Sequence, residues 1–134
     1  MNLLQSLPVT SLCALALGLW MFILTARVIF YRRAHSVVLG AGDDRVMEKR
    51  IRAHGNAAEQ IPIALILLAF SELGGANTHW LTLIAIVLII GRIMHGLYFT
   101  VHGLHWRWRF YGMSLTLAAQ AMLIGTLGSL LVSG

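Results

Sequence analysis

Charged residues, prolines and cysteines are all scarce in this chain. Of its 134 residues, 11% are charged and 58% are hydrophobic, whereas soluble domains carry about 25% charged residues. The composition therefore excludes an ordinary soluble domain and indicates a membrane protein whose length fits one small bundle. The single cysteine, Cys13, cannot form an intrachain disulfide and has no cysteine partner for a metal site.

Acidic residues are scarcer than basic ones, and five Asp and Glu against ten Lys and Arg give a formal net charge of +5. The basic residues gather in short patches beside hydrophobic runs, where topology signals and contacts with anionic membrane lipids are expected. The sequence has no basic stripe with interleaved aromatic residues, so its charge does not indicate nucleic-acid binding.

Long apolar segments are abundant, but the second, residues 61–70, is too short to cross a hydrocarbon core of about 30 Å unless its helix also includes the polar residues before it. They predict a single domain over residues 1–134, with transmembrane spans at about 9–30, 50–73, 78–101 and 109–132. Asp43 and Asp44 are both N-cap candidates, so the second helix is expected to start near Asp44, well before the membrane. The predicted fold class is an all-α membrane protein, a four-transmembrane-helix bundle.

The distribution of Lys and Arg predicts the orientation of this bundle. The first connection is rich in arginine and the third carries two more, whereas the second connection and both termini carry no Lys or Arg. By the positive-inside rule, the two basic connections face the cytoplasm, and the N- and C-termini lie on the non-cytoplasmic side. Arg27, near the end of the first span, is expected to anchor that span at the interface.

The most polar segment of the chain leads into the second span. Its residues Arg52, Asn56 and Glu59 recur at i, i+4 and i+7, which places them on one helix face. Polar side chains at membrane depth are costly, so this face is expected to line a bundle interior or a wet cavity. For Arg52 alone, an anchor at the helix end is an equally good interpretation.

The third span adds a second polar group, Arg92 and His95, on one face. Glu59 and Arg92 are each about two turns from the same membrane edge, so we predict that they form a buried ion pair. Further cationic or ionisable side chains belong to this end, namely Arg52, His54, His95, Arg107 and Arg109. Such an excess of positive charge suits an anionic ligand with several carboxylates, which arginine binds through paired hydrogen bonds.

No motif in the sequence indicates a metal site, since His102 and His105 lack a third ligand at matching spacing. Neither a phosphate-binding loop nor a serine-nucleophile motif is present. Because the chain supplies no evident nucleophile, its cationic pocket fits an enzyme that activates a thiol cofactor.

Three segments resemble the MAPEG family, the membrane-associated proteins of eicosanoid and glutathione metabolism. They are Arg52-Ala53-His54-Gly55-Asn56-Ala57-Ala58-Glu59-Gln60-Ile61-Pro62 in the second span, Gly91-Arg92-Ile93-Met94-His95 in the third, and Arg109-Phe110-Tyr111-Gly112 at the start of the fourth. The resemblance covers nearly the whole chain and is to small, bacterial-type members, which implies a multi-pass protein of a bacterial inner membrane.

The resemblance also implies a homotrimer that binds glutathione between neighbouring subunits, near the cytoplasmic face. It assigns to glutathione binding the residues Arg52, His54, Asn56, Glu59, Arg92, His95 and Tyr98. Arg109 matches an arginine near the thiol, where a guanidinium favours the nucleophilic thiolate, and Arg107 is the alternative for this catalytic role. A hydrophobic acceptor would arrive from the bilayer between helices. Two positions depart from prostaglandin-synthase-type members, Phe99 where they have tyrosine and Gly55 where they have arginine.

The leading hypothesis is a membrane-bound, glutathione S-transferase-like enzyme, a glutathione-dependent transferase or peroxidase that conjugates or reduces hydrophobic electrophiles. The alternative is a non-catalytic lipid- or ligand-binding membrane protein on the same scaffold, which the departures at Phe99 and Gly55 permit. A small transporter or proton relay is a third class, motivated by ionisable residues at membrane depth. Those residues cluster at one end and form no chain across the bilayer.

Overall fold

A computed structural model of the chain describes residues 6–133 as a bundle of long helices. These are α2 (Pro8–Ala34), α3 (Arg45–Leu73), α4 (Thr78–Thr100) and α5 (Arg107–Ser133), and residues 6–133 contain no strand. Each of the four is long and apolar enough to cross a membrane. The predicted fold class, an all-α membrane protein with four transmembrane helices, is therefore confirmed.

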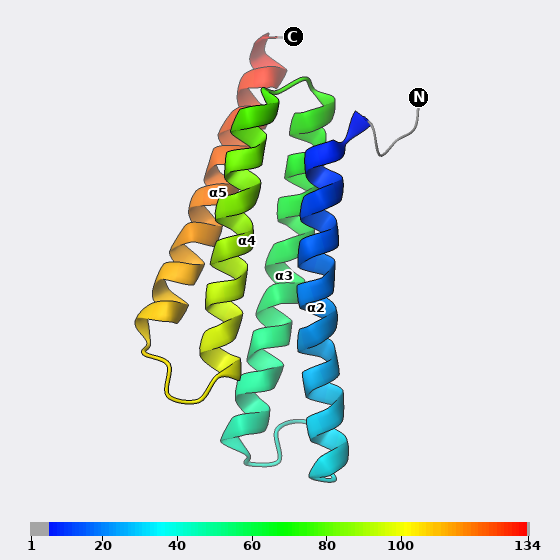
Figure 1. The fold of residues 1–134 in the computed structure, drawn as a ribbon, viewed down its shortest axis with the longest axis vertical. Coiled ribbons are helices and arrows are strands. Elements are labelled where there is room, and N and C mark those ends of the chain that lie inside the picture. The colour runs from blue at the N-terminus through cyan, green and yellow to red at the C-terminus, as the bar shows by residue number, and fades with distance from the viewer. Residues whose placement is uncertain (1–5, 134) are drawn as a thin grey trace.

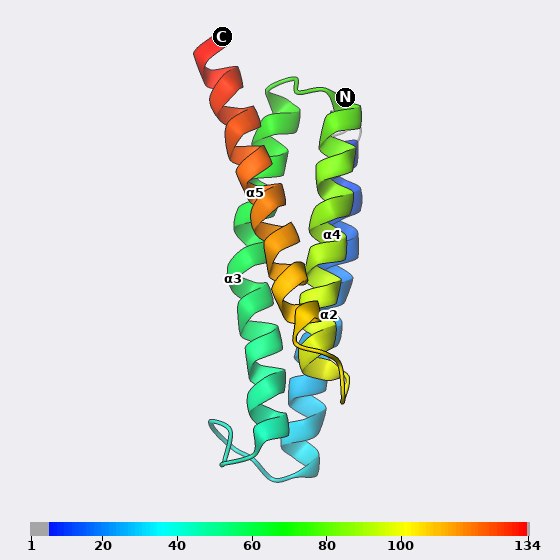
Figure 2. The ribbon, with the colours of Figure 1, turned by 90° about the vertical axis from the view of Figure 1, so that its left-hand side faces the viewer.

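The two basic connections lie at the same end of the bundle, which we call the basic end. Figure 1 shows the α2–α3 and α4–α5 loops there, while the described ends of α2 and α5 lie at the opposite end beside the α3–α4 turn. The helices α2 and α3 have 27 and 29 residues, about 40 and 44 Å of helix. Their loop extends beyond the α4–α5 loop (Figures 1 and 2).

Side-chain caps fix where α3 and α2 begin. The Asp44 carboxylate accepts hydrogen bonds from the backbone N–H groups of Val46 and Met47, at 2.7 and 3.2 Å, so α3 starts where the sequence predicts. The first turn of α2 is capped from another helix. Glu72 of α3 accepts hydrogen bonds from the N–H groups of Val9 and Thr10, at 2.9 and 2.8 Å.

All four helices contribute leucine or alanine to one buried core. Its fully buried leucines are Leu17, Leu24, Leu68, Leu81, Leu88 and Leu123. Burial of such side chains against neighbouring helices fixes the rotation of each helix about its axis.

A close crossing of α4 and α5 depends on two glycines. A Cβ atom at Gly112 would lie 2.5 Å from the His95 backbone nitrogen, and one at Gly91 would lie 2.9 Å from the Gly112 carbonyl oxygen. Only glycine fits such an approach of two backbones. The crossing brings the start of α5 against the stretch of α4 that carries Arg92 and His95, and α5 then inclines across the bundle (Figure 2).

Farther from the basic end, two polar contacts tie α5 to its neighbours. The Gln120 side-chain amide donates to the backbone oxygen and to Oε1 of Gln60 on α3, at 3.2 and 3.1 Å. The Trp80 indole of α4 donates to the Thr126 hydroxyl at 3.0 Å. Each bond satisfies a polar group that lipid could not.

Candidate functional site

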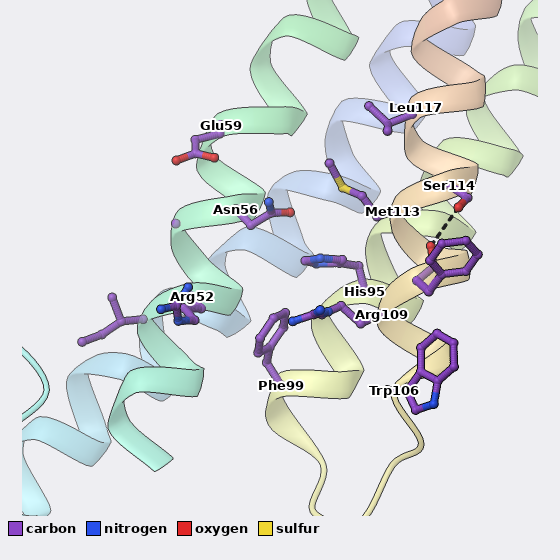
Figure 3. Close-up of a pocket in the computed structure, with 13 residues that line it drawn as sticks. Arg52, Asn56, Glu59, His95, Phe99, Trp106, Arg109, Met113, Ser114 and Leu117 are labelled. Atoms are coloured by element: carbon purple, nitrogen blue, oxygen red, sulfur yellow. Dashed lines mark hydrogen bonds between the residues drawn. The ribbon is translucent and has the colours of Figure 1, made fainter. Parts of the chain in front are cut away.

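A cleft of about 830 Å³ opens at the basic end between α3, α4 and α5. This volume is typical of clefts that bind small molecules. Figure 3 shows its side chains, with Arg52, Asn56 and Glu59 on α3 at one side and Met113, Ser114 and Leu117 on α5 at the other. The full lining comprises Ile51, Arg52, Gly55, Asn56, Glu59, His95, Phe99, Trp106, Arg109, Phe110, Met113, Ser114 and Leu117.

The α3 wall of the cleft is polar because Arg52, Asn56 and Glu59 share one helix face. Arg52 and Glu48 lie one turn apart and form an exposed ion pair, with Nη2 and Oε1 2.9 Å apart, at the rim of the cleft. Glu59 is also exposed, and it forms no ion pair with any residue in the range 6–133. The wall therefore offers one partly neutralised cation, one amide and one available carboxylate.

Arg92 lies behind this wall and is fully buried. Its Nη2 donates to Oδ1 of Asn56 at 2.8 Å. Its Nε and Nη1 find no hydrogen-bond partner within the described part of the chain, and no carboxylate there lies within 4.0 Å. The predicted Glu59–Arg92 ion pair is thus wrong, because Arg92 binds Asn56 while Glu59 remains exposed on the cleft side of α3.

His95 is the second buried polar group at the cleft, with only 5% of its surface exposed. Its ring packs against Phe99, with 5.3 Å between ring centres. Its Nδ1 has no hydrogen-bond partner among residues 6–133. Buried polar atoms are nearly always hydrogen-bonded in folded proteins, so Arg92 and His95 are the buried groups at the cleft that keep hydrogen-bonding capacity within the described part of the chain.

The α5 wall brings Arg109 into the cleft, and Figure 3 shows it beside Phe99. Its guanidinium carbon lies 5.7 Å from the centre of the Tyr98 ring, within the range of a cation–π contact. Arg107, the alternative candidate, is exposed and does not line the cleft, and its backbone N–H donates to Nδ1 of His105. Of these two arginines, Arg109 therefore lines the cleft and Arg107 does not.

The candidate residues fall into two groups by position. Those in the cleft wall are Arg52, Asn56, Glu59, His95 and Arg109, and those outside it are His54, Arg92, Tyr98 and Arg107. Of the second group, Arg92 and Tyr98 contact the wall through Asn56 and Arg109. His54 is half-buried on α3, and its side chain forms no hydrogen bond with any of the other candidate residues.

An apolar wall completes the cleft, and reasoning from charge missed it. It consists of Phe110, Met113 and Leu117 along one face of α5 and of Trp106, which immediately precedes this helix. Their spacing of four, three and four residues is a helical signal that could have identified this face. A polar wall opposite an apolar one suits a reaction between a charged, water-soluble molecule and a lipophilic one. Among residues 6–133, no group of three His, Cys, Asp or Glu side chains could hold a metal ion.

Comparison with known proteins identifies the family of this chain. The model of the MAPEG family matches residues 10–129. The chain is similar to the inner membrane protein YecN from two strains of Escherichia coli, K12 and O6:H1, with 37% identity over 116 residues in each case. The match covers 87% of this chain and 87% of each relative. The match spans all four helices and the cleft, and the chain belongs to the MAPEG family.

Proposed function

We propose that this protein is a membrane-bound, glutathione-dependent transferase or peroxidase that acts on hydrophobic electrophiles. The observation that carries this proposal is Arg92, a fully buried guanidinium with two nitrogens that lack a partner among residues 6–133. A buried charge is costly unless an opposite charge meets it. An anion bound at the adjacent Asn56 would supply that charge.

The residues at the cleft fit the groups of glutathione, which has two carboxylates and an ammonium. Arg52 and Arg92 are suited to carboxylates, Glu59 to the ammonium, and Asn56 to a peptide amide. Bound glutathione would supply the thiol, since the lining contains no cysteine and the Ser114 hydroxyl donates to the Phe110 carbonyl.

Arg109 is the residue that we assign to thiol activation. A free thiol has a pKa of about 8.5, and a nearby guanidinium stabilises the thiolate, which is the nucleophile. In conjugation, a carbon–sulfur bond forms as the leaving group departs with its electron pair. In peroxide reduction, two thiols give up two electrons to form a disulfide, while the peroxide becomes an alcohol and water. Trp106, Phe110, Met113 and Leu117 would hold the lipophilic acceptor.

Calorimetric titration of glutathione into the detergent-solubilised protein tests the binding half of this proposal. We expect saturable binding that Arg92→Met weakens about ten- to a hundredfold, because one charge-assisted hydrogen bond contributes about 1.5–3 kcal/mol. Arg45→Gln is the matched control, since Arg45 is exposed and lies outside the cleft. No binding by well-folded protein, or equal weakening by both variants, would contradict the proposed site.

Conjugation of glutathione to an aryl halide tests the catalytic half. At pH 7, Arg109→Ala should lower the rate about tenfold or more, because less of the thiol is ionised. The difference in rate between Arg109→Ala and the wild type should become smaller above about pH 9, where the thiol is ionised even without a nearby guanidinium. Arg107→Ala should leave the rate within about twofold of wild type. A pH-independent loss, or a larger effect of Arg107→Ala, would remove Arg109 from this role.

Two lining residues favour a second candidate function, a non-catalytic ligand-binding protein on the same scaffold. Phe99 brings no hydroxyl into the cleft, and Gly55 brings no side chain. This candidate predicts that Arg109→Ala leaves glutathione affinity unchanged and that no acceptor is turned over. Measurable conjugation by the wild type, lost in Arg109→Ala, would exclude it.

We also propose that the protein is a homotrimer in a bacterial inner membrane, by analogy with its family and with relatives that are named inner membrane proteins. In such an assembly, a neighbouring subunit would border the open side of the cleft.

A further inference from the structure

A second concave site lies at the basic end, on the α2 side of the bundle and away from the cleft. It has a volume of about 320 Å³ and is lined by Ile29, Arg32, Arg33, Ser36, Val37 and Val38. These residues belong to the last turns of α2 and to the loop that follows it (Figure 1). None of them takes part in the glutathione site proposed above.

The loop is held in place over the end of α2, so this concavity is preformed. The Arg32 side chain donates to the carbonyl oxygen of Gly40 at 2.9 Å, and more weakly to that of Val37 at 3.5 Å. The Val37 N–H donates in turn to the Arg32 carbonyl at 3.0 Å. Ser36 has a φ of 56°, the left-handed conformation that turns the chain back. The hydrogen bonds of the Arg32 side chain therefore hold the loop in this conformation.

Arg33, by contrast, is available to bind a ligand. It is exposed, and no hydrogen bond or ion pair joins its side chain to any residue from 6 to 133. Val38, which lines the same concavity, is 94% exposed, and the next residue in the chain, Leu39, is 88% exposed. An exposed guanidinium next to exposed aliphatic side chains is suited to a ligand that carries a negatively charged group beside an apolar group.

The position of Arg33 along α2 identifies the membrane depth of the site. Exposed apolar residues form a stripe along α2 that consists of Leu12, Leu15, Leu19, Phe22 and Ile29. At 1.5 Å per residue, Leu12 and Ile29 are about 26 Å apart, close to the thickness of a hydrocarbon core. Arg33 follows Ile29 on the same face, about 6 Å farther along, which is the level of lipid headgroups.

We infer that the Ile29–Val38 concavity binds the headgroup of an anionic phospholipid. The phosphate lies against the Arg33 guanidinium, an acyl chain follows the α2 stripe, and Val38 and Leu39 contact the interfacial part of the lipid. The positive-inside rule assigns this site to the cytoplasmic leaflet. A zwitterionic headgroup fits less well, because its own ammonium competes with Arg33 for the phosphate and is repelled by the basic end.

Native mass spectrometry of the purified full-length protein tests this inference. The protein is equilibrated with equal amounts of phosphatidylglycerol and phosphatidylethanolamine that carry the same acyl chains. We expect preferential retention of phosphatidylglycerol, reduced about fivefold in Arg33→Gln, the effect of one basic residue near a membrane surface. Arg33→Lys should largely keep the preference, because the charge remains.

Arg45→Gln is the matched control, since it removes the same charge from the same end but lies outside the concavity. Retention should be unchanged in this variant. Equal retention of the two lipids by the wild type would overturn the inference. So would equal losses in Arg33→Gln and Arg45→Gln, which would mean diffuse attraction. Displacement of the lipid by glycerol 3-phosphate alone would assign the concavity to a soluble phosphate instead.

Discussion

At the scale of single residues, Arg92 is the side chain whose environment is hardest to explain without a ligand. A buried guanidinium with one hydrogen bond, to Asn56, contributes little to folding, because its desolvation is not offset by an opposite charge. We therefore expect that Arg92→Met leaves the melting temperature of ligand-free protein unchanged or raises it. Glutathione should raise the melting temperature of the wild type and have little effect on the variant.

The opposite result would identify a different partner for Arg92. If a carboxylate of a neighbouring subunit met Arg92, removal of the guanidinium would strand that carboxylate and lower stability by roughly 3–5 kcal/mol. A large fall in the melting temperature of ligand-free Arg92→Met would therefore contradict our interpretation. Arg92→Lys keeps the positive charge but loses the planar guanidinium. Its comparison with Arg92→Met therefore distinguishes the effect of the charge from the effect of the side-chain shape.

A second residue-scale prediction concerns Asp44, which lies outside the membrane-spanning part of α3. The Tyr31 hydroxyl donates to its carboxylate at 2.7 Å and holds the pKa of Asp44 below its ordinary value, with help from the Met47 and Val46 N–H groups. A carboxylate with a lowered pKa in the folded state stabilises the fold above its ordinary pKa, and this contribution disappears as the pH falls through the folded-state value. Tyr31→Phe should raise the pKa of Asp44.

Carbon-13 NMR of the aspartate carboxyl carbons, followed against pH, measures this change directly. The difference in melting temperature between the wild type and Asp44→Ala should be constant above about pH 5 and shrink at lower pH. A pKa of Asp44 that is the same in Tyr31→Phe and in the wild type would show that the hydroxyl does not act on it.

At the scale of helices, the crossing of α4 and α5 sets the geometry of the cleft. Gly112→Ala places a Cβ atom where the His95 backbone nitrogen lies 2.5 Å away, so α5 must move. Such overpacking costs typically 1–3 kcal/mol, and we expect a melting temperature lower by several degrees together with weaker glutathione binding. Gly125→Ala is the control on the same helix, because nothing lies within 4 Å of its Cβ position. Equal effects of both variants would contradict the role of the crossing.

A separate prediction concerns the cap that Glu72 provides for the first turn of α2. In glutamine, an NH2 donor replaces one of the two Glu72 oxygens that accept from the Val9 and Thr10 N–H groups, so Glu72→Gln should destabilise the protein by about 0.5–2 kcal/mol. The N-terminal helix dipole adds to this loss, because it favours the negative charge. Glu48→Gln is the matched control, whose exposed ion pair with Arg52 contributes about 0.3–0.5 kcal/mol. Thermal unfolding in detergent measures both, and equal shifts would count against the cap.

These elements also mark what the sequence can and cannot predict. Helical spacing was enough to place Arg52, Asn56 and Glu59 on one wall, because residues i, i+4 and i+7 share a face whatever lies opposite. The partner of Arg92 could not be predicted in this way, since it depends on how α3 is rotated against α4. Arg27 illustrates the same limit. Its place near the end of the first span was evident from the sequence, but its partner was not, and it donates to the Thr100 carbonyl at the end of α4, at 2.8 Å.

The apolar wall shows a different limit. Phe110, Met113 and Leu117 have the composition and spacing of residues that face lipid, and sequence alone does not distinguish a lipid-facing stripe from the wall of a ligand cleft. Their assignment depends on the Gly91–Gly112 crossing, which turns this face of α5 toward α3 and α4. Glycine is common in membrane helices, so the sequence alone does not show that Gly91 and Gly112 contact each other.

At the scale of the whole molecule, the open side of the cleft argues for an assembly. Glu59, Trp106 and Phe110 line the cleft and are themselves exposed, and an enzyme that activates a thiol gains from excluding water around it.

We expect native mass spectrometry of the detergent-solubilised protein to give a homotrimer at three times 14.8 kDa. Glutathione should bind with one site per protomer in the trimer. Any monomer obtained by dilution or harsher detergent should bind it at least tenfold more weakly, because the neighbouring surface is lost. A monomer that binds glutathione as tightly as the assembly would mean that the cleft is complete within one chain. In that case, the exposure of Glu59 and Trp106 would have to be explained by the bilayer.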